Sequence, residues 1–350
     1  MNEKSISWYN RFRRTPAFTG CVLFLSVLLI NIVIQTPAKF LTLRNFNTLF
    51  SKNTPLILVT MAQSLLLITG TLDFSVGVQV ALVNVVTVMT TQEWGIPLYV
   101  GFVFGILASF VASAVCGAFV SLLRLPTIIA SFSMIYIIKG VNVLIMNTPQ
   151  GRIPRAYYGT YDSLLFGFIP FSLLFILLVF MIWFYVKNSR IGLHMYAVGC
   201  NPQNAYAAGI NPAGIQMKAF LLKGFIVGLA GIALTLMSAS GNPLQAEDYG
   251  IRSLSACIIG GLGFGGWGTM GCGFLGAGFL VLIQNAVYYF FTLLVKLIPG
   301  FSVNSYWQSM TSDMIIFLGL LMTIVTAKGQ REALRQGIVR QFIRGEKYVK

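Results

Sequence analysis

The sequence predicts an all-α integral membrane protein with about ten transmembrane helices, including two short, interrupted segments at repeat-like positions. Hydrophobic residues make up 56% of the 350 residues and charged residues only 9%. Soluble globular proteins carry roughly 25% charged residues, so this chain has too few polar groups to cover a surface that faces water. The mean hydropathy of +0.79 agrees with this. The composition therefore indicates a chain that folds in lipid.

Apolar stretches recur along the chain at lengths close to the roughly 20 residues that a spanning helix needs. They divide it into an N-terminal tail (1–16), a membrane domain (17–326) and a basic C-terminal tail (327–350), with one long polar connector at 187–216. Because two stretches are short, eight spans are the alternative to ten. The stretches are 17–36, 54–70, 75–91, 97–122, 126–146, 164–186, 217–239, 250–264, 268–291 and 306–326.

The basic residues predict the orientation. The chain has 24 Lys and Arg against 9 Asp and Glu, a net charge of +15. In a soluble protein this excess would suggest nucleic acid. With ten spans and an internal N-terminus, however, fifteen basic residues are cytoplasmic, seven external and two within helices, as the positive-inside rule requires. We therefore expect a multi-pass protein of the cell membrane with both termini cytoplasmic and no nucleic-acid partner. The external residues are Lys39, Arg44, Lys52, Arg152, Arg155, Arg252 and Lys296.

Two interruptions break the apolar segments at corresponding places in the two halves, at 69–75 and at 260–268. Non-helical backbone at membrane depth persists only where protein or a water-filled cavity satisfies its polar groups. Paired interruptions of this kind are typical of transporters built from repeats. They favour a transport pathway, and ordinary loops between helices are the alternative.

Polar residues in or beside the apolar segments are candidate pathway residues. Asp73, the only acid in the first interruption, either faces the pathway or caps the next helix with help from Ser75. The uncharged candidates either bond a hydroxylated solute or bond one helix to another, which is the more common use. We expect Lys139 and Lys223, both within helices, to extend towards the membrane surface and not to bind ligand. The candidates are Gln63, Asp73, Ser75, Asn84, Asn142, Gln284 and Asn285.

The sequence offers no catalytic or metal-binding constellation. Its one histidine, His194, lies in the central connector, and its five cysteines show no CxxC spacing. We therefore expect no metal site, cofactor or disulfide. The glycine-rich run 260–268 lacks the lysine of a phosphate-binding loop, so close helix packing explains it better. The chain is not expected to be an enzyme, and ATP-driven transport would need another chain to hydrolyse ATP.

The central connector contains the signals of a short helix. Asn201 is a good N-cap, Pro202 suits the first helical position and Gly209 suits the left-handed residue that ends a helix. These residues predict one or two helical turns over 202–208 on the cytoplasmic side. The alternative is a surface loop that only returns the chain.

Four segments, in order and at the expected spacing, resemble one family. They are residues 68–77 (ITGTLDFSVG), 196–211, 255–268 and 305–308 (SYWQ). They are similar to the GGxDLSVG, YAxGGN, IAAxxxGG…GGxG and SYYQ motifs of permease subunits of sugar ABC importers of the ribose/xylose/galactose type. That family is related more distantly to branched-chain amino acid permeases. The similarity covers about residues 45–326.

The resemblance implies a permease that moves a monosaccharide or similar polar solute with an ATPase subunit, an external solute-binding protein and a second permease in the lipid bilayer. It also implies that the 202–208 helix docks on the ATPase, a role carried by Gly199, Asn201, Ala205 and Gly209. A nucleoside or another small solute is the alternative cargo. A passive channel and a polytopic membrane enzyme are the rival classes.

The chain departs from the family pattern at several polar positions, so no specific sugar follows. In a symmetric dimer each such change occurs twice. We therefore expect a heteromeric pair of permeases, with a homodimer as the alternative. The departures are Thr71, Lys223, Gly250, Arg252 and Ser312.

Overall fold

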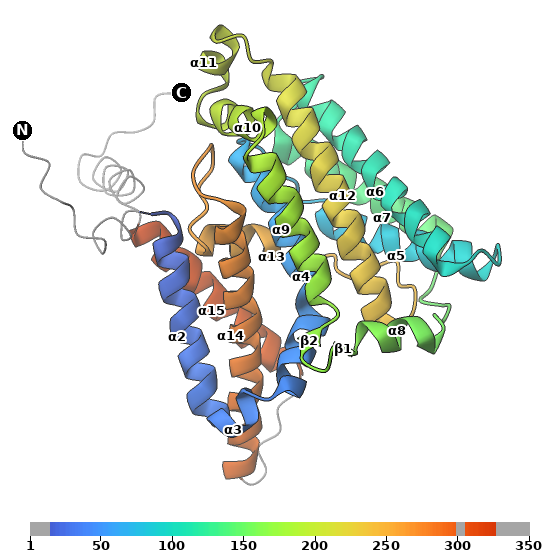
Figure 1. Ribbon diagram of the computed structural model, residues 1–350, viewed down its shortest axis with the longest axis vertical. Helices are drawn as coiled ribbons and strands as arrows, with labels where there is room; N and C mark the ends of the chain where they lie inside the picture. The colour runs from blue at the N-terminus through green and yellow to red at the C-terminus, as the bar shows by residue number, and fades with distance from the viewer. Residues whose placement is uncertain (1–14, 299–304, 327–350) are drawn as a thin grey trace, which may run out of the picture. The chain divides into compact units, whose positions relative to one another are not determined.

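The protein was analysed as a computed structural model that describes residues 15–298 and 305–326, which are almost entirely helical (Figure 1). Most of the N-terminal tail and the whole basic tail 327–350 therefore lie outside the described residues. A two-stranded antiparallel hairpin, β1 (Leu164–Leu165) and β2 (Ile169–Pro170), pairs Leu165 with Ile169. The helices are α2 (Ala17–Gln35), α3 (Pro37–Phe40), α4 (Leu43–Ile68), α5 (Val76–Gln92), α6 (Leu98–Ser121), α7 (Thr127–Ile145), α8 (Arg155–Tyr161), α9 (Leu173–Lys187), α10 (Arg190–Cys200), α11 (Pro202–Ala207), α12 (Pro212–Ser238), α13 (Tyr249–Ile259), α14 (Met270–Leu297) and α15 (Ser305–Thr326).

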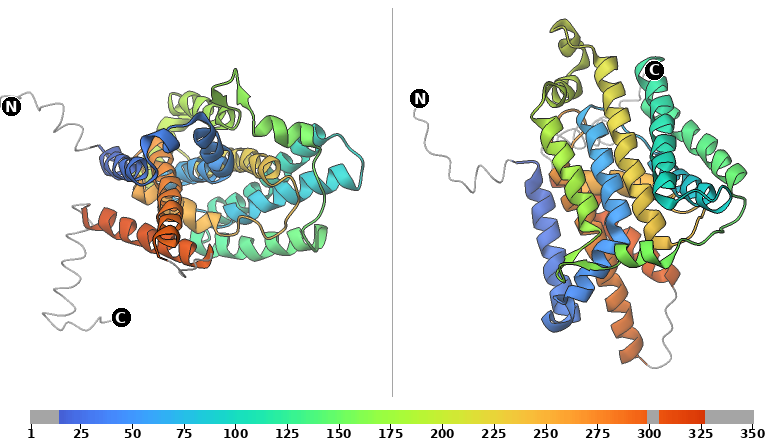
Figure 2. Two further views of the ribbon diagram at one scale, coloured as in Figure 1. Left: turned by 90° about the horizontal axis from the view of Figure 1, so that it is seen from below. Right: turned by 45° about the vertical axis from the view of Figure 1, so that its right-hand side comes forward.

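The chain forms two compact units, Met1–Leu282 and Ile283–Lys350. In the first unit, α12 packs against α4, α5 and α6 (Figure 2). Every residue from 54 to 68 of α4 is buried, and so is most of α5. The core of this unit is therefore a group of helices enclosed by other helices. Because protein and not lipid surrounds them, they can carry polar side chains that bond to neighbouring helices.

The peripheral helices α2 and α7 are more exposed. Only 17% of the most apolar window of α2 is buried within the protein and 28% of that of α7, against 78% for α12. The exposed side chains of α2 and α7 are mainly large and hydrophobic, for example Leu29, Val33 and Ile137. Such surfaces suit contact with lipid and not with water.

Among the described residues, five helices are long and apolar enough to cross a membrane: α2, α6, α7, α12 and α14. The bent pair α9 and α10, which turns by 80°, would be a sixth, and α5, α13 and part of α15 are shorter apolar helices. The fold is thus an all-α membrane protein, as predicted. The ten predicted stretches each correspond to one helix, but length and composition identify only five or six of these as spans.

Two predicted boundaries are wrong. The stretch 54–70 is not a short segment, because it forms the buried part of the 26-residue helix α4, which begins at Leu43. The stretch 164–186 begins as the β1–β2 hairpin, and its helix starts only at Leu173. Hydropathy missed the more polar helical residues 43–53 in the first case and the turn of the hairpin in the second. Both interruptions are non-helical, as predicted.

Within the first unit, α11 lies at one end, and α8 lies at the opposite end together with the β1–β2 hairpin (Figure 1). The helix α2 begins at the α11 end and finishes at the other end, where α3 follows it. The two ends are therefore separated by the length of the long helices.

Candidate functional site

The first interruption begins where α4 ends in a glycine cap. Gly70 adopts a left-handed φ of 78°, and its N–H donates to the carbonyl oxygen of Leu67 at 3.1 Å. The N–H of Thr71 donates to the carbonyl oxygen of Leu66 at 2.9 Å. This pair of bonds is the Schellman arrangement, which glycine favours because it has no Cβ. The local sequence thus turns the chain out of α4 and into the protein interior.

Asp73 lies in this turn and forms an ion pair with Lys223 of α12. The distance between Asp73 Oδ2 and Lys223 Nζ is 2.7 Å, and both side chains are fully buried. The other carboxylate oxygen of Asp73 accepts from the N–H of Ser75 at 2.7 Å and from its hydroxyl at 2.6 Å. A buried ion pair is stable only when hydrogen bonds satisfy its remaining polar atoms, and here both carboxylate oxygens have partners.

The network extends through Gln79 of α5 to α6. Lys223 Nζ donates to Gln79 Oε1 at 2.8 Å, and the hydroxyl of Ser113 donates to the same oxygen at 2.9 Å. Gln79 Nε2 donates to the hydroxyl oxygen of Ser75 at 2.8 Å. The first interruption is therefore joined by polar side chains to α5, α6 and α12. We call Asp73, Ser75, Gln79, Ser113 and Lys223 the buried polar network.

The prediction that Lys223 extends to the membrane surface is wrong, because its partners lie inside the protein. Its position in the middle of α12, the helix that packs on α4, α5 and α6, leaves no path to water. The other lysine within a helix, Lys139, is different. It is 39% exposed and pairs with Glu247 at 2.9 Å.

Gln63 of α4 supports the same turn from the other side. In the amide orientation that satisfies both groups, it donates to the carbonyl oxygen of Asp73 at 3.1 Å and accepts from the N–H of Asp73 at 3.2 Å. Gln63 is fully buried. The backbone N–H and carbonyl of Asp73 lie outside any helix and need partners. The side-chain amide of Gln63 supplies a partner for each of them.

Asn84 and Asn142 hold the segment that follows α12. Asn84 donates to the carbonyl oxygen of Ser240 at 3.0 Å and accepts from the N–H of Asn242 at 2.8 Å. Asn142 donates to the carbonyl oxygens of Val78 and Pro243, at 3.1 and 3.4 Å. Its own oxygen, Oδ1, is buried with no hydrogen-bond partner in the described part of the chain.

The remaining two candidates, Gln284 and Asn285, lie on α14 within the second unit, and both are partly buried. The structure thus brings together Gln63, Asp73 and Ser75 at the first interruption. It places Asn84 and Asn142 at a separate connector.

The sequence analysis did not identify Gln79 and Ser113 as members of the buried polar network around Asp73. A signal was available for Gln79, because it lies one helical turn after Ser75.

The two interruptions and the end of α10 meet at a set of glycines. The N–H groups of Gly265 and Gly266 donate to the carbonyl oxygens of Leu67 and Ile68, at 3.1 and 3.0 Å. The second interruption therefore supplies a donor to the carbonyl of Ile68 at the end of α4 and a second donor to that of Leu67, which Gly70 already bonds. We call Gly70, Gly199, Gly265 and Gly266 the glycine junction.

Gly199, near the end of α10, completes this junction. A Cβ at this position would overlap the carbonyl oxygen of Ile68 and lie 2.8 Å from the nitrogen of Gly266. A Cβ at Gly265 would lie 2.7 Å from the carbonyl oxygen of Gly199. Glycine is therefore required here by close approach of three backbone segments. The hydroxyl of Tyr196 also donates to the carbonyl oxygen of Gly268 at 2.9 Å.

The predicted short helix is confirmed and follows α10 directly. Asn201 caps α11 by accepting from the N–H groups of Gln203 and Asn204, at 2.9 and 3.0 Å. Gly209 ends it with φ of 81°. Of residues 201–209 only Ala205 is buried, and Tyr206 is 72% exposed. α11 is thus a capped, exposed helix whose preceding residues lie on the glycine junction.

No group of three or more His, Cys, Asp or Glu side chains suited to a metal ion occurs in the part of the chain that the structure describes. The one acidic group at the first interruption, Asp73, is neutralised by Lys223. The polar groups are therefore arranged to join helices and turns.

Comparison with known proteins gives the class of the chain. Residues 45–325 match the family described as the branched-chain amino acid transport system / permease component, and the chain belongs to this family. The D-allose transport system permease protein of Escherichia coli (strain K12) is 26% identical over 232 residues, 65% of this chain and 71% of that protein. The autoinducer 2 import system permease protein of Yersinia pseudotuberculosis (strain YPIII) is 27% identical over 231 residues, 64% of each chain.

The matched relatives are thus permease proteins of a D-allose transport system and of an autoinducer 2 import system, and the resemblance found in the four motifs is confirmed. The match spans somewhat less than two thirds of the length of the autoinducer 2 permeases. No solved structure matches the chain. The chain is a multi-pass membrane permease.

Proposed function

We propose that this permease is the membrane-spanning subunit of an ABC importer that carries a monosaccharide or a similar polar solute into the cell. A separate ATPase subunit supplies the energy, an external solute-binding protein delivers the solute, and two permease subunits enclose the pathway. The names of the relatives, a D-allose permease and an autoinducer 2 permease, support a small-solute cargo of this class. In this proposal the chain forms the path for the solute, and the ATPase subunit hydrolyses ATP.

The observation that carries this proposal is the connection between α11 and the two interruptions. α11 is exposed, as a docking helix must be, and Tyr206 gives it an aromatic side chain of the kind enriched in protein interfaces. Only Cys200 and Asn201 separate Gly199 from α11. Because Gly199 is in backbone contact with Ile68 and Gly266, a displacement of α11 by the ATPase acts directly on both interruptions. Gly199, Asn201, Ala205 and Gly209 are the proposed coupling residues.

Among the candidate pathway residues of the first unit, Asn142 is the best suited to bind solute. Its Oδ1 is buried and has no protein partner in the described residues, so it can accept from a solute hydroxyl. Gln63, Asp73, Ser75 and Asn84 make internal bonds that position the first interruption and the segment after α12. Gln284 and Asn285 on α14 remain proposed pathway residues.

The orientation and the pairing are part of the same proposal. With α11 facing an ATPase, the end of the first unit that holds α11 is cytoplasmic, and both termini are inside. The pairing is a heteromer with a second permease of the same family, because this chain departs from the family pattern at polar positions such as Lys223, whose ammonium group is paired with Asp73 inside the chain. A partner chain would then supply the polar groups that this chain lacks.

The test is transport in liposomes that contain this chain, its ATPase and its binding protein, with and without a second permease. ATP-dependent uptake of radiolabelled D-allose or another monosaccharide only with the second permease is the expected result. Full uptake with this chain as the sole permease would exclude the heteromer. Uptake without ATP hydrolysis would instead indicate a passive channel, and chemical conversion of the solute a membrane enzyme.

A further inference from the structure

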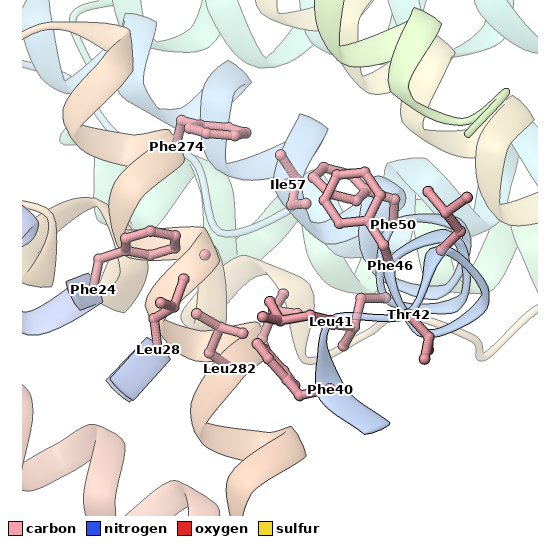
Figure 3. Close-up of a pocket in the computed structure, with 14 residues that line it drawn as sticks. Phe24, Leu28, Phe40, Leu41, Thr42, Phe46, Phe50, Ile57, Phe274 and Leu282 are labelled. Carbon is pink, nitrogen blue, oxygen red and sulfur yellow. The ribbon is translucent and has the colours of Figure 1, made fainter. Parts of the chain in front are cut away.

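An apolar cavity of about 360 Å³ lies in the first unit between α2, α3, α4 and the beginning of α14 (Figure 3). This volume is within the range of about 300–1,000 Å³ found for small-molecule sites. Among the lining residues only Thr42 carries a polar side chain. Five phenylalanines dominate the wall, together with aliphatic residues such as Leu28 and Ile57: they are Phe24, Phe40, Phe46, Phe50 and Phe274.

The cavity is held open by specific contacts. Asn31 of α2 is fully buried and donates from Nδ2 to the carbonyl oxygen of Leu282 at 2.9 Å. Gln35 donates to Asn31 Oδ1 at 3.0 Å. In an apolar setting such polar bonds fix one helix against another. Because Leu282 also lines the cavity, this clamp between α2 and α14 sets the width of the cavity at one side.

Gly278 of α14 leaves room where a larger side chain would reduce the cavity. The atoms nearest to a Cβ at this position would be those of the Phe24 ring, with Cε2 at 2.6 Å. The ring of Phe24, which also lines the cavity, therefore packs directly against Gly278. A larger side chain at position 278 would push this ring away from α14 and into the cavity.

Two basic residues flank the segment 40–43, which lines the cavity. Lys39 directly precedes Phe40, and Arg44 directly follows Leu43, and both basic residues are exposed. Residues 15–72 contain no Asp or Glu, so no acid close in sequence neutralises them. Both were assigned to an external connector, where the positive-inside rule disfavours basic residues. An anionic partner would account for two cations at this position.

An apolar slot with two cations at its edge matches an anionic amphiphile. A sugar or another polar solute would leave its hydroxyl groups without partners in this slot, so the cavity does not suit the cargo. An acyl chain fills it without that cost, while a phosphate at the membrane surface reaches the two basic side chains.

We propose that this cavity is a binding site for an anionic glycerophospholipid of the external leaflet. One acyl chain occupies the space between Phe24, Phe46 and Gly278, and the headgroup phosphate binds Lys39 and Arg44. Bound lipid fills the gap between α2 and α4 and so stabilises the contact of α2 with the rest of the first unit.

The test uses phosphatidylglycerol with a photoactivatable diazirine on one acyl chain, added to the purified importer complex in phosphatidylcholine nanodiscs. Mass spectrometry should place the label on peptides of α2 and α4. Replacing Lys39 and Arg44 together (Lys39→Gln, Arg44→Gln) should lower this labelling ~5-fold for each charge, since each basic residue near a membrane surface contributes about that factor. Arg155→Gln, an exposed basic residue on α8, is the matched control and should change nothing.

A second variant tests the cavity itself. Gly278→Leu should abolish labelling of α2 and α4, whereas Gly140→Leu on α7, at a position where a Cβ would meet no atom within 4 Å, should leave it unchanged. Equal labelling by a phosphatidylcholine probe, or labelling unaffected by both the Gln variants and Gly278→Leu, would overturn the proposal. Cross-linking of a second protein chain to the cavity in place of lipid would overturn it as well.

Discussion

Lys223 Nζ lies 2.7 Å from Asp73 Oδ2, and the two side chains come from α12 and from the turn between α4 and α5, 150 positions apart in the sequence. Neither side chain is exposed. The pair thus fixes the turn of the first interruption to the central helix of the first unit. Because Gln79 bonds to Lys223 and Ser113 bonds to Gln79, loss of the pair would affect three helices, α5, α6 and α12.

Removing one member of this pair should destabilise the permease. Lys223→Ala leaves the carboxylate of Asp73 buried without a counter-ion, which typically costs about 3–5 kcal/mol. The expected result is a large fall in the unfolding temperature of the purified chain in detergent. The double variant Asp73→Asn, Lys223→Met removes both charges and should recover most of that loss. A double variant no more stable than Lys223→Ala would show that the charge pairing is not the cause.

The glycine junction should tolerate no side chain at Gly199. Gly199→Ala places a Cβ against the carbonyl oxygen of Ile68, a backbone atom that cannot move without shifting α4 or α10. ATP-dependent uptake in liposomes should fall at least tenfold. Gly140→Ala, at an open position of α7, is the control and should transport normally. Normal uptake by Gly199→Ala would separate the junction from the transport cycle.

Substitutions of Gly209 should strain the backbone at the end of α11 without creating a steric clash. Its φ is 81°, and a Cβ there would meet no atom within 4 Å. A left-handed conformation costs an L-residue about 1–2 kcal/mol, and a β-branched residue more. Gly209→Val should therefore weaken ATPase association and uptake more than Gly209→Ala, with normal membrane insertion of both. Co-purification of the ATPase measures this, and equal association for all three chains would contradict the docking role of α11.

The proposed orientation predicts the labelling of engineered cysteines. Residue 158 lies on α8 and residue 204 on α11, at opposite ends of the first unit (Figure 1). In intact cells a membrane-impermeant maleimide should label Tyr158→Cys and not Asn204→Cys. Equal labelling of the two variants would be inconsistent with the structure, and the reverse pattern would invert the orientation.

Asn142 should contribute to transport more than to assembly. Asn142→Leu removes the unpartnered Oδ1 together with two hydrogen bonds to backbone carbonyls. Asn84→Leu removes an equally buried amide whose oxygen is already bonded to Asn242, so it serves as the matched comparison. We expect Asn142→Leu to reduce the rate of uptake more than Asn84→Leu at a similar loss of stability, about 1–3 kcal/mol in each case. Equal uptake by the two variants would remove Asn142 from the pathway.

The sequence by itself determined the features that depend on local chemistry. Composition determined an all-α membrane protein, and glycines placed both interruptions where the helices end. Asn201, Pro202 and Gly209 defined α11 before any tertiary contact was known, because a cap residue, a first-turn proline and a left-handed glycine act within a few residues of chain. The four motifs, read in order, placed the chain in its family.

Only the tertiary structure decided the partners of the polar residues. Lys223 was expected at the membrane surface because a long side chain in an apolar helix usually reaches water. Its actual position depends on which face of α12 meets α5 and α6, and periodicity is uninformative in a helix that is apolar on all sides. The contact of Gly199 with Ile68 and Gly266 could not be predicted either, because it joins three segments that are far apart in the sequence. Long-range packing, and not local propensity, brings these groups together.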